Sequence, residues 1–251
     1  MQEVESVRLK IRLKVDKLNL PISYKHILQG VIYDMLRHDD QGIFYHDKGY
    51  QLEDKVFKMF VFSDLLGKYE IKGDRIVFDD QVVFYVSSMD NDFAQQIYTF
   101  LENNDAVYML KQKAGIVSFD VQQIKPFRGV KEITLKTISP ITAYTTKDKK
   151  VTYFYPGSPE FEKSLRDNIE HKFTAYEYPA QNVEFNITGI EYSKKLIVKY
   201  KDTLYAAYKC EFKVLTNYDC LRIMYETGAG SKNSCGFGMI EIRNEKDNIS
   251  V

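Results

Sequence analysis

The chain has 251 residues, of which 44% are apolar and 28% charged, and its 35 Lys and Arg residues are balanced by 35 Asp and Glu residues. This composition excludes a disordered or fibrous protein, and zero net charge argues against indiscriminate nucleic-acid binding while allowing a confined basic track. No apolar run approaches the roughly 20 residues of a membrane span, and the charged N-terminus lacks the apolar core of a secretory signal. We therefore expect a cytoplasmic protein that has no membrane partner.

The first half of the chain predicts the order strand, helix, two strands, helix, strand. Apolar and charged residues alternate over 4–14, which is typical of a half-buried strand. Ser23 can cap a helix that runs to about Arg37, and acidic residues can cap a second helix over 90–104. The segment 41–54 contains two glycines and is expected to be a loop. The remaining strands are expected at 55–62, 75–87 and 107–124.

The first predicted helix carries two distinct sets of side chains. One side carries His26, Gly30, Tyr33 and Arg37. The apolar stripe lies elsewhere on the helix and consists of Ile27, Leu28, Val31, Ile32, Met35 and Leu36. Because Tyr33 is off this stripe, we expect it to lie outside the core.

The second half repeats the order of the first half with longer insertions. Helices are expected from about Ser158 to His171 and over 217–227, the latter capped by Asn217 and ended by Gly228. Strands are expected at 130–138, 183–192, 194–201, 204–214 and 237–243.

These elements predict an α+β protein made of two tandem ferredoxin-like (βαββαβ) units. We expect the units to span residues 1–125 and 126–251, with a boundary near Pro126. The first unit holds 16 Lys and Arg against 19 Asp and Glu, whereas the second holds 19 against 16. This difference is a slight indication that the second unit meets a polyanion.

The sequence contains no recognisable metal or cofactor motif. Cys210, Cys220 and Cys235 form no C-x-x-C pair, so they predict neither a zinc site nor a disulfide framework. Patterns such as H-x-x-E-H or D-x-D-x-D-G are absent from the sequence. We therefore expect free thiols, no metal and no cofactor.

The stretch 228–238, GAGSKNSCGFG, contains four of the thirteen glycines in the chain. So dense a cluster predicts that the backbone comes close to another group. A dinucleotide fingerprint is excluded because these glycines follow a helix, and a P-loop because Lys232 precedes Asn233 instead of Ser or Thr. CGFGMIEI (235–242) is only partly similar to an RNA-binding RNP1 strand, because it lacks the leading basic residue and the two later aromatic residues. A turn whose glycines merely ease packing stays open as the alternative.

The full pattern is G-h-G, five residues and G-h-G again, placed after a C-terminal helix. It resembles the signature of the repeat-associated RNA-processing proteins of CRISPR systems. More narrowly, the chain resembles the sixth-type CRISPR endoribonucleases, which cut precursor CRISPR RNA within its repeats. The segments LQGVIYDML (28–36), YHDKG (45–49) and SKNSCGFG (231–238) carry this resemblance, which spans the chain and implies two tandem ferredoxin-like units.

The resemblance implies metal-independent cleavage of RNA. The 2′-hydroxyl of the RNA attacks the adjacent phosphate and leaves a 2′,3′-cyclic phosphate and a 5′-hydroxyl. This reaction needs a proton acceptor, a proton donor and a positive charge at the phosphorane. Histidine suits the first two roles because its pKa lies near 7, and lysine suits the third.

Residue by residue, the resemblance assigns the chemistry to the first unit. His46 matches the catalytic histidine, Tyr33 a helix tyrosine that could orient the 2′-hydroxyl, and Lys55 a lysine near the phosphate. Other residues stay open for these roles: His26, His38 and His171 for the histidine, and Lys48 for the lysine.

The glycine-rich stretch is expected to bind the RNA backbone, with its amides pointing outward as a nest for phosphate oxygens. The residues assigned to this role are Gly228, Gly230, Ser231, Lys232, Asn233, Ser234, Gly236 and Gly238. The expected partner is CRISPR repeat RNA, and a homodimer or a CRISPR effector complex that receives the product are further candidates. Two other functions stay open: a non-catalytic RNA-binding subunit of the same superfamily, and a scaffold that binds no RNA.

Overall fold

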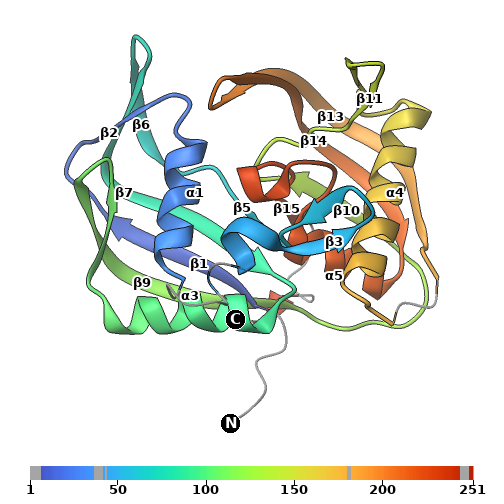
Figure 1. Cartoon of the computed structure of the whole chain (residues 1–251), viewed down its shortest axis with the longest axis horizontal. Helices are drawn as coiled ribbons and strands as arrows, with labels where there is room; N and C mark the ends of the chain where they lie inside the picture. Colours follow the sequence, from blue (N-terminus) through green and yellow to red (C-terminus); the bar gives the residue numbers. More distant parts are fainter. Residues whose placement is uncertain (1–6, 37–41, 43, 180–181, 244–248, 251) are drawn as a thin grey trace.

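The computed structural model describes residues 7–36, 42, 44–179, 182–243 and 249–250. Figure 1 shows two sheets side by side, each accompanied by helices. Within the described ranges, no helix is both long enough and apolar enough to span a membrane.

The first sheet is built around the N-terminal strand β1 (Val7–Lys14), which pairs antiparallel with β7 (Arg75–Ser88) and with β9 (Gln112–Ile124). The alternation predicted for β1 is confirmed on one face, where Leu9, Ile11 and Leu13 are buried. They share one core with residues of helices α1 (Lys25–Asp34) and α3 (Asn91–Asn103). The remaining strands of this sheet are β2 (Leu18–Pro21), β5 (Phe60–Phe62), β6 (Leu66–Lys72), β8 (Ala106–Met109) and β16 (Ile249–Ser250).

The second sheet has the strand order β13-β14-β10-β15. Its helices α4 and α5 begin where the sequence predicts, because the side chains of Ser158 and Asn217 accept hydrogen bonds from the amides of Phe161 and Cys220. A separate core lies between this sheet and its helices. The bounds are β10 (Lys131–Thr137), α4 (Pro159–Ala175), β13 (Phe185–Tyr200), β14 (Thr203–Thr216), α5 (Tyr218–Thr227) and β15 (Ile240–Arg243).

Both sheets follow the same plan, in which the first strand lies between the third and the last. In the first sheet β1 lies between β7 and β9, and in the second β10 lies between β14 and β15. This is the ferredoxin-like order, so the predicted α+β fold of two such units is confirmed. The chain leaves the first sheet at the end of β9 and enters the second at β10. The unit boundary near Pro126 stays a prediction.

Several predicted elements differ from the observed ones. The segment 41–54 is not a plain loop, because it contains the π-helix η1 (Phe44–Lys48) and the first strand of the hairpin β3 (Tyr50–Leu52) and β4 (Lys55–Phe57). The strand expected over 55–62 is divided at Met59, whose φ of 50° breaks the extended backbone. Conversely, the two strands expected over 183–201 form one strand, β13, because β14 pairs with it along its whole length.

The N-terminus of α1 also differs from the prediction. Tyr24, not Ser23, occupies the cap position, and its side chain makes no capping hydrogen bond. The helix therefore depends on packing of its apolar stripe, which includes the buried residues Leu28 and Ile32. The predicted end of the helix at Arg37, together with His38, lies outside the described residues.

Arg8 joins the two units. The alternation of β1 predicts this side chain on the solvent side, but Arg8 is fully buried. Its guanidinium stacks on the ring of Tyr225 in α5 and donates to the backbone oxygens of Tyr225 and Ile240. The face of the first sheet opposite its helices is thus covered at this point by the second unit, which a local alternation pattern cannot reveal.

Candidate functional site

Tyr33 and His46, two of the three predicted catalytic residues, lie together. Tyr33 is on α1 and His46 is on η1, and their ring centroids are 4.7 Å apart. The neighbouring Tyr45 is buried against Phe93 of α3, which anchors the turn. His46 therefore points outward, with 61% of its side chain exposed.

Hydrogen bonding orients the His46 ring. Nδ1 of His46 lies 2.5 Å from a carboxylate oxygen of Asp47. An ionised carboxylate can only accept, so Nδ1 carries the proton of this hydrogen bond. In the neutral ring Nε2 then has the free lone pair, and it is the atom that can accept a proton.

Tyr33 is suited to donate a hydrogen bond. Its side chain is half-buried, and this burial raises the pKa of the phenol above its ordinary value, with smaller contributions from Cys235 and Asp47. A phenol with a raised pKa stays protonated at neutral pH. Tyr33 can therefore orient an oxygen atom beside His46 but cannot serve as a phenolate base there.

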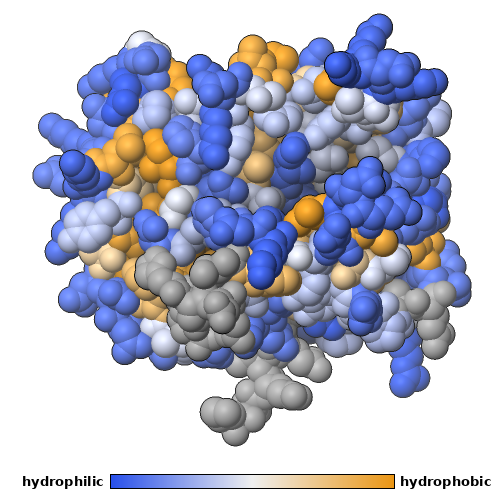
Figure 2. Space-filling view, in the orientation of Figure 1, coloured by the Kyte–Doolittle hydropathy of each residue, from blue (hydrophilic) through white to orange (hydrophobic). Residues whose placement is uncertain are grey.

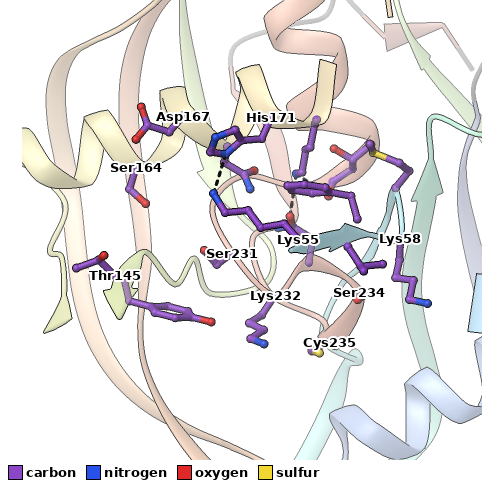
Figure 3. A pocket seen from close by; sticks show the side chains of 18 of the residues that line it. Lys55, Lys58, Thr145, Ser164, Asp167, His171, Ser231, Lys232, Ser234 and Cys235 are labelled. Carbon is purple, nitrogen blue, oxygen red and sulfur yellow. Dashed lines mark hydrogen bonds between the residues drawn. The ribbon is translucent and has the colours of Figure 1, made fainter. Parts of the chain in front are cut away.

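Lys55, the third predicted catalytic residue, reaches in another direction. Lys55 lies on β4, and its Nζ is 3.4 Å from Nδ1 of His171 on α4, across the boundary between the two units (Figure 3). The lysine that contacts the His46 segment is Lys58, whose Nζ donates to the His46 backbone oxygen at 2.9 Å. The structure thus brings Tyr33 and His46 together, but not Lys55. Sequence reasoning missed Lys58, because a hydrogen bond to a backbone oxygen requires no particular sequence motif.

A cleft of about 880 Å³ lies where the two units meet. Its walls are the β3–β4 hairpin, α4, the second-unit strand β11 (Tyr144–Lys147) and the glycine-rich stretch. Figure 3 shows Lys55, Ser231 and Lys232 around this cleft. Hydrophilic side chains cover most of the molecular face shown in Figure 2. β11 forms a hairpin with β12 (Lys150–Tyr153), and the 3₁₀ turn η2 (Asn233–Cys235) belongs to the glycine-rich stretch.

The glycines of this stretch contact other parts of the protein. This corrects the prediction that they are needed for a close approach of the RNA backbone. Gly230, Gly236 and Gly238 are buried and have φ values between +73° and +83°. A Cβ on Gly238 would lie 1.9 Å from the Ala229 oxygen, and one on Gly236 would lie 2.6 Å from the Phe62 ring of β5. Gly228, with φ of +86°, would meet the Asn233 side chain. The close approach that requires glycine is therefore intramolecular.

Many polar groups assigned to RNA are bonded within the protein as well. The amides of Ser231, Gly236 and Gly238 donate to backbone oxygens, at distances of 2.8 to 2.9 Å. The side-chain nitrogen of Asn233 donates to the backbone oxygens of Ala229 and Phe237. The expectation of an outward-pointing nest is thus wrong for these groups. The side chain of Lys232 is exposed, and those of Ser231 and Ser234 are partly exposed at the cleft.

Lys172 of α4 holds the glycine-rich stretch through hydrogen bonds. Its buried Nζ donates to the backbone oxygens of Thr227 and Gly228 and to Oδ1 of Asn233. Burial lowers the pKa of Lys172 to about 7. Sequence reasoning missed this residue, although a signal exists: Lys172 falls on the apolar stripe of α4 with Leu165 and Ile169, where a lysine is unexpected.

No cluster of metal-binding side chains is found in the part of the chain that the structure describes. There, no three His, Cys, Asp or Glu residues gather in a way that could hold one ion. The three cysteines are free, as the sequence predicts.

Fold and site together define an α+β protein with two ferredoxin-like sheets, an exposed histidine beside a half-buried tyrosine, and a glycine-rich stretch between the units. The family model described as "CRISPR associated protein Cas6, C-terminal" matches residues 120–242. The chain is similar to the Cas6 family of CRISPR-associated endoribonucleases.

Individual relatives are similar over nearly their full length. A "CRISPR-associated endoribonuclease Cas6 1" of Methanocaldococcus jannaschii is 29% identical over 97% of this chain and 96% of the relative. A "CRISPR-associated endoribonuclease Cas6" of Pyrococcus furiosus is 25% identical over 96% of this chain and 90% of its own length. The solved structure titled "CRISPR associated protein Cas6" has a TM-score of 0.71 and 25% identity, and covers 96% of this chain and 100% of the other.

Proposed function

We propose that this protein is a metal-independent endoribonuclease that cleaves precursor CRISPR RNA within its repeats, in the cytoplasm. The observation that carries the proposal is the Tyr33–His46 pair. It combines a solvent-exposed imidazole with a neutral phenol, and the two ring centroids are 4.7 Å apart. Similarity to the Cas6 family supports the substrate class, since the curated relatives are named CRISPR-associated endoribonucleases.

In the proposed reaction the RNA supplies its own nucleophile. The 2′-oxygen forms a bond to the adjacent phosphorus while the bond from phosphorus to the 5′-oxygen breaks, which leaves a 2′,3′-cyclic phosphate and a 5′-hydroxyl. Nε2 of His46 accepts the 2′-hydroxyl proton, because Nδ1 is engaged by Asp47. Tyr33 orients the 2′-hydroxyl or the leaving oxygen by donating a hydrogen bond. A proton bound by His46 can later pass to the 5′-oxygen.

A lysine neutralises the phosphorane in this proposal, and three are candidates. Lys55 matches the resemblance but contacts His171, Lys48 is exposed at the end of η1, and Lys58 bonds to the His46 backbone. Alanine variants of the three should be compared in single-turnover cleavage. We expect Lys55→Ala to slow the chemical step most, by about 10-fold or more, because loss of one charge at the phosphorane acts on the transition state. A larger loss in Lys58→Ala or Lys48→Ala would move the role to that residue.

RNA binding is proposed at the cleft between the units, where the exposed Lys232 and the hydroxyls of Ser231 and Ser234 are available. The glycines and Asn233 support the backbone that presents these groups. We propose further that residues 1–125 carry the chemistry and residues 126–251 the RNA-binding stretch. Homodimer formation and transfer of the product to an effector complex belong to the same proposal.

Cleavage of a labelled repeat RNA in excess EDTA tests the reaction class. We expect a 2′,3′-cyclic phosphate product, and no cleavage when a 2′-deoxy nucleotide precedes the scissile bond, although that RNA should still bind. Cleavage of the deoxy substrate, or a strict need for a divalent ion, would overturn the mechanism. Binding of both RNAs without cleavage of either would favour the alternative, a non-catalytic RNA-binding subunit. The observation that favours this alternative is the contact of Lys55 with His171, away from His46.

A further inference from the structure

One face of α1 connects the candidate catalytic pair to the glycine-rich stretch. Lys25, Gln29 and Tyr33 follow one another at intervals of four residues and therefore share this face. Nζ of Lys25 donates to the Gly236 backbone oxygen at 2.8 Å, and Nε2 of Gln29 donates to the Ser234 backbone oxygen at 2.7 Å. The stretch from the second unit thus runs along the same helix face that ends in Tyr33.

Both side chains are themselves held in place. Oε1 of Gln29 accepts a hydrogen bond from the Tyr200 hydroxyl of β13, so its amide bridges two elements of the second unit. Lys25 is buried, forms an ion pair with Asp64, and its Nζ lies 5.4 Å from the centroid of the Phe237 ring. Neither residue belongs to the glycine-rich stretch, although Gln29 lies in the segment LQGVIYDML (28–36).

The carbonyl oxygens at Ser234 and Gly236 flank Cys235 and follow Lys232 by two and four residues. A shift of these carbonyls along α1 would therefore move the proposed RNA contacts of Ser231 and Lys232 relative to Tyr33. A displacement of about 1 Å in a reacting geometry is enough to slow a reaction by about 100-fold. The placement of RNA against the catalytic pair thus depends on where the stretch is held on the helix.

We propose that Lys25 and Gln29 are positioning residues, which set the glycine-rich stretch along α1 and so determine which phosphodiester of the bound RNA reaches Tyr33 and His46. This inference rests on the proposed function. It assigns to Lys25 and Gln29 the selection of the cleavage position, without contact with the reacting atoms.

The test uses Gln29→Met, which keeps the length of the side chain but removes both hydrogen bonds without adding charge. Tyr200→Phe removes the bond to Oε1 of Gln29 and also the contact of the same hydroxyl with Cys235, and Gln95→Met on the exposed face of α3 is the matched control. Lys25→Arg, which retains a cationic donor, is compared with Lys25→Met. For each folded variant we would measure the single-turnover rate, the affinity for a 2′-deoxy repeat RNA, and the position of cleavage by product mapping.

We expect Gln29→Met to lower the single-turnover rate by about 10- to 100-fold and to spread cleavage over neighbouring phosphodiesters, with affinity changed less than about 3-fold. Tyr200→Phe should show a weaker form of this effect, Lys25→Arg should preserve most of the wild-type behaviour, and Gln95→Met all of it. Wild-type rate and cleavage position in a folded Gln29→Met variant would overturn the inference. So would a loss of affinity that accounts for the whole loss of rate.

A second measurement separates this inference from the proposed function. If the wild-type chain cleaves no repeat RNA, the proposed function fails, but amide hydrogen exchange still reports how the stretch is held. Faster exchange over 231–236 in Gln29→Met, with unchanged exchange in α3, would support the positioning contact. Unchanged exchange over 231–236 would overturn it.

Discussion

The Tyr33–His46 pair and the glycine-rich stretch are packed in opposite ways. His46 is largely exposed on a short π-helix, and its ring touches the protein through Tyr33 and Asp47. The glycine-rich stretch is buried along most of its length, and contacts from β5, α1 and α4 determine its backbone. A catalytic side chain must be accessible to its substrate, whereas a segment that carries binding side chains needs a fixed backbone. The two regions should therefore fail differently when mutated.

The largest effect is expected where the proposed chemistry is most exposed. His46→Ala should lower the single-turnover cleavage rate by about 10²- to 10⁴-fold, the range for loss of a general acid or base. The melting temperature should barely change, because the side chain is mostly in solvent. A variant that cleaves at the wild-type rate would shift the role to His26 or His38. Nδ1 of His26 is 2.9 Å from the Ser23 backbone oxygen.

The opposite failure is expected in the glycine-rich stretch. Gly238→Ala places a Cβ about 1.9 Å from the Ala229 oxygen at a φ of +79°. We expect the free energy of unfolding to fall by about 3–5 kcal/mol, measured by urea denaturation. Gly73→Ala is the matched control, because Gly73 also has a positive φ but no atom lies within 4 Å of its added Cβ. The control should lose about 1–2 kcal/mol. Equal losses would show that backbone strain, and not packing, makes glycine necessary.

Lys172 makes the stability of the second region depend on pH. Its pKa is about 7 in the folded chain, against an ordinary value of 10.5. Between these values the unfolded chain binds a proton that the folded chain does not, so stability rises with pH by up to about 1.4 kcal/mol per unit. Below pH 7 both states are protonated and this contribution to the slope disappears.

Urea denaturation between pH 7 and 10 can detect this contribution. Lys172→Met should be less stable than wild type, because it leaves the oxygens of Thr227 and Gly228 without their donor. Its stability should also rise less steeply with pH than that of wild type. Parallel slopes in the two proteins would contradict the lowered pKa.

The smallest effect is expected at the accessible edge of the glycine-rich stretch. Lys232→Ala should weaken binding of single-stranded repeat RNA and reduce the log–log salt slope by about 0.7, the value for one phosphate contact. Lys113→Ala, an exposed lysine on β9, is the control and should leave the slope unchanged. Unchanged affinity and slope in a folded Lys232→Ala variant would leave the stretch with a packing role alone.

Much of the fold follows from local patterns in the sequence. Alternation over β1, the stripe of α3 and the caps Ser158 and Asn217 are short-range signals, and the elements they predict are present. The segment 41–54 gives no such signal, because a π-helix and a three-residue strand have no strong periodicity. The resemblance predicts His46 and Tyr33 as functional residues, whereas the fold alone decides that they lie close together in space.

The sequence by itself determined many of the strands and helices, because burial periodicity and capping act within a few residues. It also determined that the stretch 228–238 needs glycine. Tertiary structure decided why: the groups that come close are Phe62, Thr142 and the stretch itself, separated from the glycines by up to about 170 residues of chain. It also turned Arg8, Lys25 and Lys172 inward to bind backbone oxygens. A buried cation depends on partners that are distant in sequence, so no local pattern could reveal its role.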